Sequence, residues 1–228
     1  RHFRNMPGEG DLPVGDFLRA VLATGYAGPL SLEIFNDQFR GGSARTIARD
    51  GHRSLVALMD AVRRAEPDVS AELPPMPAPV AIRDTAFVEF AARGQEREEM
   101  AGLLRGLGFA HAGRHITRDL DLWQQGDIRI VLNAELEGHA GNAYAVHGLT
   151  VCDIGLSVPS AADTMARATA LGAPPFSQPR VPGELPIPAI RGLSGSVLHF
   201  MDDSDVWDAE FRETGQLASS GAGLTRID

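Results

Sequence analysis

A proline-rich stretch divides this sequence into two parts. Five of the fifteen residues from Glu66 to Val80 are proline. Because proline has no amide hydrogen to donate and cannot continue a helix, the stretch predicts a semi-rigid spacer. We place the linker at residues 68–81 and expect residues 1–67 and 82–203 to fold as separate domains. Residues 204–228, which are polar and rich in Gly and Ser, are expected to form a connector.

The composition excludes several classes of partner. The chain has 228 residues and a net charge of −9, which argues against nucleic acid and anionic membranes. A single cysteine, Cys152, excludes an intrachain disulfide and indicates a reducing, cytoplasmic location. No apolar run reaches the roughly 20 residues that span a bilayer. The first residues lack an initiator Met, so we expect a fragment of a longer protein, and we leave homo-oligomerisation open.

The first part of the chain reads as helix, strand, helix. Apolar residues at helical spacing predict helices over 14–25 and 44–65. Between them, the apolar run of residues 30–35 predicts a short buried strand that carries one carboxylate, Glu33. A carboxylate in such a strand needs a partner. We leave two alternatives open from the pattern itself, namely an ion pair with a buried Arg and a metal ligand at the carboxyl end of a barrel strand.

Three segments of the first part carry a resemblance to a known family, and they span residues 1–4, 7–13 and 31–40. They are similar to the bacterial two-domain 3-dehydroshikimate dehydratases, in which a xylose isomerase-like TIM barrel is followed by a 4-hydroxyphenylpyruvate dioxygenase-like half. The resemblance implies that Glu33 binds a divalent metal ion of the Mg, Mn or Co class and that Arg4 binds the substrate carboxylate. The remaining ligands and the general base are implied to lie outside this chain, so the catalytic residues are unknown.

The second part of the chain repeats one pattern. A strand, a helix and three short strands are predicted between residues 82 and 133, and the same order begins again at Leu149. Two such βαβββ modules form the paired-module sheet of the vicinal oxygen chelate fold. Segments 151–158 and 189–200 also resemble the amino-terminal half of 4-hydroxyphenylpyruvate dioxygenase. The predicted fold class is therefore α/β plus α+β: a C-terminal piece of a TIM barrel, then a vicinal oxygen chelate domain.

A metal site in residues 82–203 is not expected. The positions that carry ligands in such modules hold Glu89 in the first strand and Cys152 or Asp153 in the later one. His199 stands alone in the last strand, where a histidine is more often hydrogen-bonded in the core than a ligand. Three side chains that converge on one face are required, and the pattern shows no such set. Cys152 is interpreted as an inert buried thiol.

The function implied by the resemblance is dehydration of 3-dehydroshikimate to protocatechuate in aromatic catabolism. A divalent ion polarises the ketone and a base removes the adjacent proton, and the substrate is a small carboxylated ring. Three alternatives stay open. They are an iron-dependent dioxygenase of the 4-hydroxyphenylpyruvate type, a sugar phosphate isomerase or epimerase on the same barrel, and a non-catalytic scaffold. The fragment by itself is expected to be inactive.

Overall fold

The computed structural model describes residues 3–66, 68, 75–192, 195–203, 207–216 and 223–227. Arg1 and His2 of the first motif lie outside the described residues. The chain divides at Pro77 into two compact units, here called unit 1 and unit 2, and each is described by itself. No helix within the described residues combines the length and the apolar character that crossing a membrane requires.

Unit 1 is built from two helices that pack on each other. The α-helices are α1 (Val14–Ala23) and α2 (Ala44–Ala65), with a short 3-10 helix η1 (Asp37–Gly41) between them. Ser43 caps α2 by accepting a hydrogen bond from the Thr46 amide at 3.4 Å, as the sequence predicts. The small core joins Leu18 and Leu22 of α1 to Val62 of α2. Both predicted helices are therefore confirmed.

The predicted buried strand over residues 30–35 is wrong. No strand forms there, and Phe35 is 55% exposed. The one ladder-type contact of this region is an isolated antiparallel bridge between Phe3 and Asn36. A strand needs hydrogen-bonding neighbours along its length, and the backbone bond from the Arg4 amide to the Phe35 carbonyl reaches only the end of this run. The apolar pattern instead lets Leu30 pack beside the cluster of α1 and α2.

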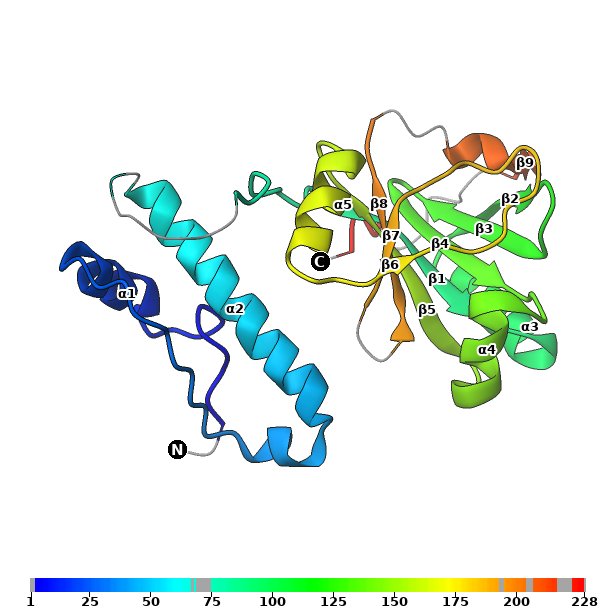
Figure 1. Cartoon of the computed structure of the whole chain (residues 1–228). Coiled ribbons are helices and arrows are strands. Elements are labelled where there is room, and N and C mark those ends of the chain that lie inside the picture. Colours follow the sequence, from blue (N-terminus) through cyan, green and yellow to red (C-terminus); the bar gives the residue numbers. More distant parts are fainter. Residues whose placement is uncertain are drawn as a thin grey trace. The chain divides into compact units, whose positions relative to one another are not determined.

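Unit 2 is one curved nine-stranded sheet with helices outside it (Figure 1). The first module comprises β1 (Asp84–Ala91), α3 (Gly94–Gly106), β2 (Ala110–His115), β3 (Leu120–Gln125) and β4 (Ile128–Asn133). After α4 (Gly138–His147), the second module comprises β5 (Thr150–Ser157), α5 (Ala161–Ala170), β6 (Pro175–Phe176), β7 (Ala189–Arg191) and β8 (Val197–Met201). A 3-10 helix η3 (Trp207–Glu210) and β9 (Phe211–Glu213) follow.

The two modules share one topology. The strand order is β6-β7-β8-β5-β1-β4-β3-β2-β9. In the first module β1 pairs in parallel with β4, and in the second β5 pairs in parallel with β8. The antiparallel pair of β1 and β5 joins the modules at the centre of the sheet. The repeat predicted from the sequence is therefore confirmed as two βαβββ modules in one sheet.

The sheet has a helix-covered outer face and a hollow inner face. On the outer side, Leu104 of α3 packs with Trp123, Ile130 and Leu132 in one buried cluster. On the inner side, Phe87, Leu122 and Trp207 belong to a second cluster. Strand alternation explains the division, because neighbouring residues of a strand point to opposite faces. Leu103 of α3 is 56% exposed.

A glycine shapes the inner face at the module junction. Gly155 of β5 stands opposite Phe87 of β1 in the register. A Cβ atom at Gly155 would lie 2.3 Å from the Phe87 ring, closer than side chains can approach. The absence of a side chain therefore lets the aromatic ring lie across β5, where it forms part of the floor of the hollow.

Several elements were not predicted. Helix α4 is short and rich in Gly and Ala, so it carries almost no amphipathic signal. The strand β7 begins only at Ala189, after Pro186 and Pro188, which cannot donate to a ladder. The connector placed at 204–228 contains η3 and β9, which pairs with β2. Residues 223–227 form no strand.

Candidate functional site

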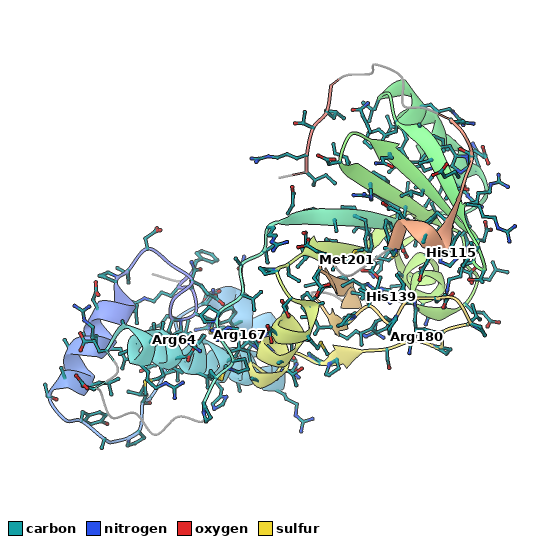
Figure 2. All side chains as sticks on the ribbon, turned by 90° about the horizontal axis from the view of Figure 1, so that it is seen from above. Arg64, His115, His139, Arg167, Arg180 and Met201 are labelled. Carbon is teal, nitrogen blue, oxygen red and sulfur yellow. The ribbon has the colours of Figure 1, made fainter. Side chains whose placement is uncertain are left out.

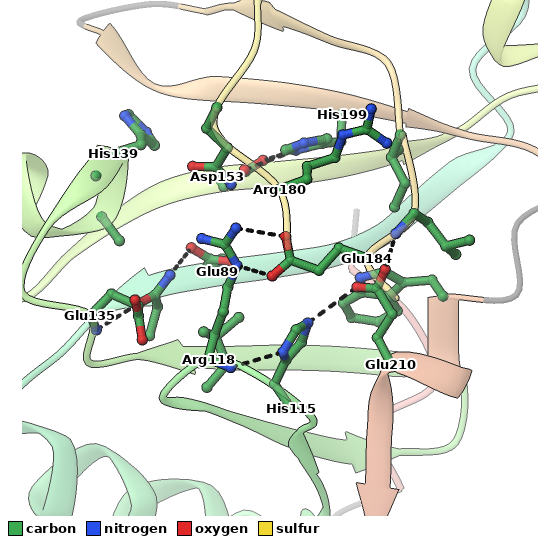
Figure 3. A pocket seen from close by; sticks show the side chains of 18 of the residues that line it. Glu89, His115, Arg118, Glu135, His139, Asp153, Arg180, Glu184, His199 and Glu210 are labelled. Carbon is green, nitrogen blue, oxygen red and sulfur yellow. Dashed lines mark hydrogen bonds and ion pairs between the residues drawn. The ribbon is translucent and has the colours of Figure 1, made fainter. Parts of the chain in front are cut away.

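A cavity of about 290 Å³ lies in the hollow of unit 2 (Figure 3). Its floor comes from β1, β4, β5 and β8, and its far wall comes from η3. Residues 177–188, here called the strap, pass along its mouth and contribute Arg180, Glu184 and Ile187 to the lining. Figure 2 shows His115, His139 and Arg180 gathered in this part of unit 2. The cavity combines an apolar side with a group of titratable residues, as small-molecule sites do.

Glu89 occupies the centre of the floor. Its carboxylate accepts a hydrogen bond from Asn133 Nδ2 at 2.8 Å and contacts the Cys152 thiol at 3.4 Å. Its backbone is the direct register partner of Asp153 on β5. Burial first, and then the negative charge of Asp153, raise the pKa of Glu89 to about 7. Glu89 therefore exchanges a proton near neutral pH, which is the range that acid–base chemistry requires.

Asp153 and His199 form a buried ion pair beside Glu89. The Nδ1 atom of His199 lies 2.8 Å from one oxygen of Asp153 and 2.9 Å from the other. Burial lowers the pKa of His199, but the hydrogen bond and the charge of Asp153 outweigh it, so the net pKa is raised. Because Asp153 occupies Nδ1, the Nε2 atom has no hydrogen-bond partner among the described residues. The pair thus orients an imidazole whose second nitrogen is available to a ligand.

The strap is pinned to the hairpin of β2 and β3. Arg118 binds Glu184 with both branches of its guanidinium, Nη2 lying 2.7 Å from Oε2, and Nη2 also donates to the Pro179 carbonyl at 2.9 Å. Thr117 donates a further bond to Glu184 at 3.0 Å. The hydrogen bond from Arg118 is the main reason that the pKa of Glu184 falls to about 2. This bidentate pair fixes the strap at the cavity mouth.

A second attachment runs through His115 and Glu210. His115 Nδ1 accepts bonds from the amides of Thr117 and Arg118, both at 3.2 Å. Its Nε2 therefore carries the hydrogen and donates to Glu210 at 3.2 Å. The other oxygen of Glu210 accepts from the Leu185 amide in the strap. His115 and Glu210 are consequently engaged in holding the strap.

His139 and Cys152 serve structure at the edge of the cavity. The Nε2 atom of His139 donates to the Cys152 carbonyl at 2.8 Å, and its ring packs against Phe176. Cys152 is 1% exposed, and burial raises the pKa of its thiol above the ordinary value. The interpretation of Cys152 as an inert buried thiol is confirmed.

The sequence left His199 without a partner, but the structure pairs it with Asp153. Glu89, Asp153 and His199 meet on the inner face of the sheet. Strand alternation is the signal that could have found them, because each stands two residues from another inward-facing position, and the topology brings β1, β5 and β8 together. In the described part of the chain no group of three His, Cys, Asp or Glu side chains is arranged to hold a metal ion.

The two site residues predicted in unit 1 lie in one small region. The Arg4 amide donates to the Phe35 carbonyl at 3.2 Å, and Asn36 Nδ2 donates to the Arg4 carbonyl at 3.0 Å. The Arg4 guanidinium lies over the Phe35 ring, 5.9 Å from its centre. Glu33 is exposed and makes no ion pair with another described residue. The alternative of a buried Glu33–Arg pair is therefore not supported within the described part of unit 1.

Unit 2 matches a known protein family. The family model described as hydroxyphenylpyruvate dioxygenase, N-terminal, matches residues 76–212, which is more than half of the chain. The chain belongs to the hydroxyphenylpyruvate dioxygenase N-terminal domain family. A 4-hydroxyphenylpyruvate dioxygenase of Pseudomonas aeruginosa is 32% identical over 66% of this chain and 44% of its own length. The vicinal oxygen chelate fold predicted for the second part is thereby confirmed.

Some relatives of this chain match unit 1 as well as unit 2. A 3-dehydroshikimate dehydratase of Pseudomonas aeruginosa is 39% identical over 100% of this chain, and one of Pseudomonas putida is 38% identical over the same share. The chain spans 37% of the length of each of these relatives. A solved xylose isomerase-like TIM barrel/4-hydroxyphenylpyruvate dioxygenase fusion protein matches the whole chain with a TM-score of 0.85 and 39% identity, over 37% of that protein. The predicted resemblance and fold class are confirmed.

Proposed function

We propose that this chain is part of a metal-dependent 3-dehydroshikimate dehydratase, a hydro-lyase that forms protocatechuate in the cytoplasm. The supporting observation is the extent of the match. The dioxygenase relative matches 66% of the chain, whereas the two dehydratases match all of it. Unit 1 therefore has counterparts in dehydratases, and a barrel is where the chemistry of such an enzyme resides.

In this proposal Glu33 and Arg4 act in the barrel. Glu33 is one ligand of a divalent ion of the Mg, Mn or Co class, and its exposure leaves the carboxylate accessible for coordination. Arg4 binds the substrate carboxylate, because its planar guanidinium matches a carboxylate with two parallel hydrogen bonds. The bond from the Arg4 amide to the Phe35 carbonyl and the bond from the Asn36 side chain to the Arg4 carbonyl support this pairing of roles, since they hold Arg4 near the segment that carries Glu33. The bound ion supplies Lewis-acid polarisation of the ketone.

Turnover of 3-dehydroshikimate by the whole natural protein tests this proposal. The expected result is formation of protocatechuate, which is detected by its ultraviolet absorbance. Arg4→Ala should raise KM by about tenfold or more, the loss expected for roughly 1.5–3 kcal/mol of charged hydrogen bonding. Arg49→Ala, an exposed arginine of α2, serves as the matched control and should leave KM unchanged.

Two results would contradict the proposal. One is failure of the metal-loaded protein to convert 3-dehydroshikimate while it converts 4-hydroxyphenylpyruvate in the presence of iron and oxygen. The other is turnover of a sugar phosphate that is indifferent to Arg4→Ala, because a substrate without a carboxylate does not need that side chain.

A further inference from the structure

The cavity of unit 2 has the dimensions of a site for a single ring. Its volume of about 290 Å³ stands at the lower end of the range of small-molecule sites, roughly 300–1,000 Å³. One side of its lining is apolar. Phe87 and Trp207 stack on each other with ring centres 4.9 Å apart, and Leu185 and Ile187 of the strap complete this side. Such walls favour a flat, partly apolar ligand.

The floor of the cavity offers hydrogen-bonding groups for hydroxyls. His199 Nε2 has no partner among the described residues, because Asp153 holds Nδ1. Glu89 stands next to this pair and exchanges its proton near neutral pH. Together they present one imidazole nitrogen and one carboxyl group that both donate and accept. Two neighbouring oxygen substituents on a ring match this arrangement.

The rim of the cavity carries one arginine that the protein does not engage. Arg180 lines the cavity from the strap, and no hydrogen bond or ion pair joins its side chain to another described residue. By contrast, Arg118 in the same cavity is bound to Glu184. An exposed guanidinium at the mouth favours an anionic group on the ligand.

Three of the carboxyl groups that line the cavity carry a reduced charge. Asp153 is paired with His199, and Glu184 is paired with Arg118. Burial raises the pKa of Glu89 to about 7, so this carboxyl is partly protonated at neutral pH. Glu135, Glu137 and Glu210 also line the cavity and form no ion pair with an arginine of the described residues. Arg180 is therefore the cation that an anionic group at the mouth requires.

We propose that the cavity of unit 2 is a binding site for a small hydroxylated ring carboxylate, with its carboxylate at Arg180 and its hydroxyls at His199 and Glu89. The site is separate from the one assigned to Glu33 and Arg4. It stands on residues of unit 2 alone and does not depend on the proposed dehydratase activity.

Three probe compounds test separately the binding of the carboxylate and the binding of the hydroxyl groups. 3,4-Dihydroxybenzoate carries both groups, catechol lacks the carboxylate, and benzoate lacks the hydroxyls. Calorimetric titration of the protein at pH 7.5 should show that 3,4-dihydroxybenzoate binds at least tenfold more tightly than either of the others. The indole N–H signal of Trp207, which lines the cavity, should shift on binding. That of Trp123, which lies in the outer cluster, should not.

Substitutions then test which residue binds the carboxylate and which binds the hydroxyl groups. Arg180→Ala should weaken 3,4-dihydroxybenzoate at least tenfold and leave catechol unchanged, and Arg212→Ala, an exposed arginine of β9, should change neither. His199→Gln should weaken both hydroxylated compounds and leave benzoate unchanged. Arg4→Ala must leave the Trp207 shift unchanged, because Arg4 belongs to the separate site proposed in the barrel. Because Arg180 is exposed, its removal does not threaten folding, so the test does not depend on His199→Gln being stable.

The proposal is overturned if 3,4-dihydroxybenzoate produces no heat and no Trp207 shift at millimolar concentration. It is also overturned if Arg180→Ala binds as the unmodified protein does, or if catechol and 3,4-dihydroxybenzoate bind equally.

Discussion

At the scale of single residues, the protonation states in the cavity of unit 2 depend on how each charged group is buried and paired. Burial first, and then the charge of Asp153, disfavour the ionised form of Glu89, and together they outweigh the hydrogen bonds from Asn133 and Cys152 that favour it. Glu184 experiences the opposite environment, because Arg118 stabilises its charge and lowers its pKa to about 2. Two glutamates of one cavity thus differ in protonation at neutral pH, because burial dominates for Glu89 and the pair with Arg118 dominates for Glu184.

The raised pKa of Glu89 predicts a stability that depends on pH. The folded-state pKa of about 7 exceeds the ordinary value of 4.5, so the contribution of this carboxyl is fully present below pH 4.5 and is lost as the pH rises through 7. Glu89→Gln mimics the protonated form. It should raise the free energy of unfolding at pH 8 by on the order of 2 kcal/mol, since one pKa unit is worth about 1.4 kcal/mol, and change little at pH 4.5.

Denaturant unfolding at both pH values measures this effect. Glu98→Gln, at an exposed position of α3, is the matched control and should be neutral at each pH. An equal gain for Glu89→Gln at pH 4.5 and pH 8 would contradict a neutral-pH titration of this residue.

At the scale of elements, helices and strands with a strong hydrophobic period were predicted correctly from the sequence. Elements that depend on pairing with distant residues were missed. The amphipathic helix over 44–65 and the strand ending at Asn133 have local signals that the structure confirms. The run over 30–35 was misjudged because a strand also needs neighbours. β9 was missed because three residues form it, and only its pairing with β2 defines it.

The candidate site shows the same limit. Glu89 and His199 could be named from the sequence, but their meeting could not be predicted, because it arises from the crossover that places β8 beside β5. The partner of His199 depends on register, and a register shift between Glu89 and Phe90 leaves Cys152 unpaired in the ladder, with its thiol in contact with the Glu89 carboxylate. Attachment of the strap by Arg118 joins residues 66 positions apart, and no local pattern records such a pairing.

The strap supplies a prediction at this scale. Glu184→Gln removes the charge that binds Arg118 and Thr117, so the strap should open more often. The loss of a charge-assisted hydrogen bond is worth about 1.5–3 kcal/mol, which corresponds to amide exchange at least tenfold faster in residues 181–187. In the unmodified protein this contribution is present above pH 4.5 and is lost as the pH falls toward 2.

Hydrogen exchange followed by mass spectrometry checks the expectation. Glu213→Gln, at an exposed position of β9, is the control and should leave exchange in the strap unchanged. Unaltered protection of the strap in Glu184→Gln would show that His115 and Glu210 hold it without help from Arg118.

At the scale of the whole molecule, the two units differ in how complete their cores are. Unit 2 closes a nine-stranded sheet over two buried clusters. The described part of unit 1 has four buried apolar residues, Met6, Leu18, Leu22 and Val62, while Phe3, Phe17 and Phe35 are each more than half exposed. Because burial of apolar surface is the main stabilising term, unit 2 has the features of an independently stable domain and unit 1 does not.

We therefore predict that residues 78–228, expressed by themselves, unfold cooperatively, with a melting temperature that a chelator leaves unchanged. Residues 1–77 by themselves should show no cooperative transition. Calorimetry measures both. A drop of several degrees in the melting temperature of residues 78–228 on addition of EDTA would indicate a metal within unit 2 and contradict this account.

The central claim, that unit 1 contributes a metal ligand to a dehydratase, is tested most directly by Glu33→Gln in the whole natural protein. Because a neutral amide costs less to bury than a carboxylate, the substitution should leave the metal-free protein folded. Bound divalent metal should fall below one ion per chain, and turnover of 3-dehydroshikimate should drop by at least a hundredfold, since Lewis-acid stabilisation is worth several kcal/mol and about 1.4 kcal/mol is tenfold in rate. Glu98→Gln should retain both metal and rate. A Glu33→Gln protein that keeps its metal content and its turnover would contradict the assignment.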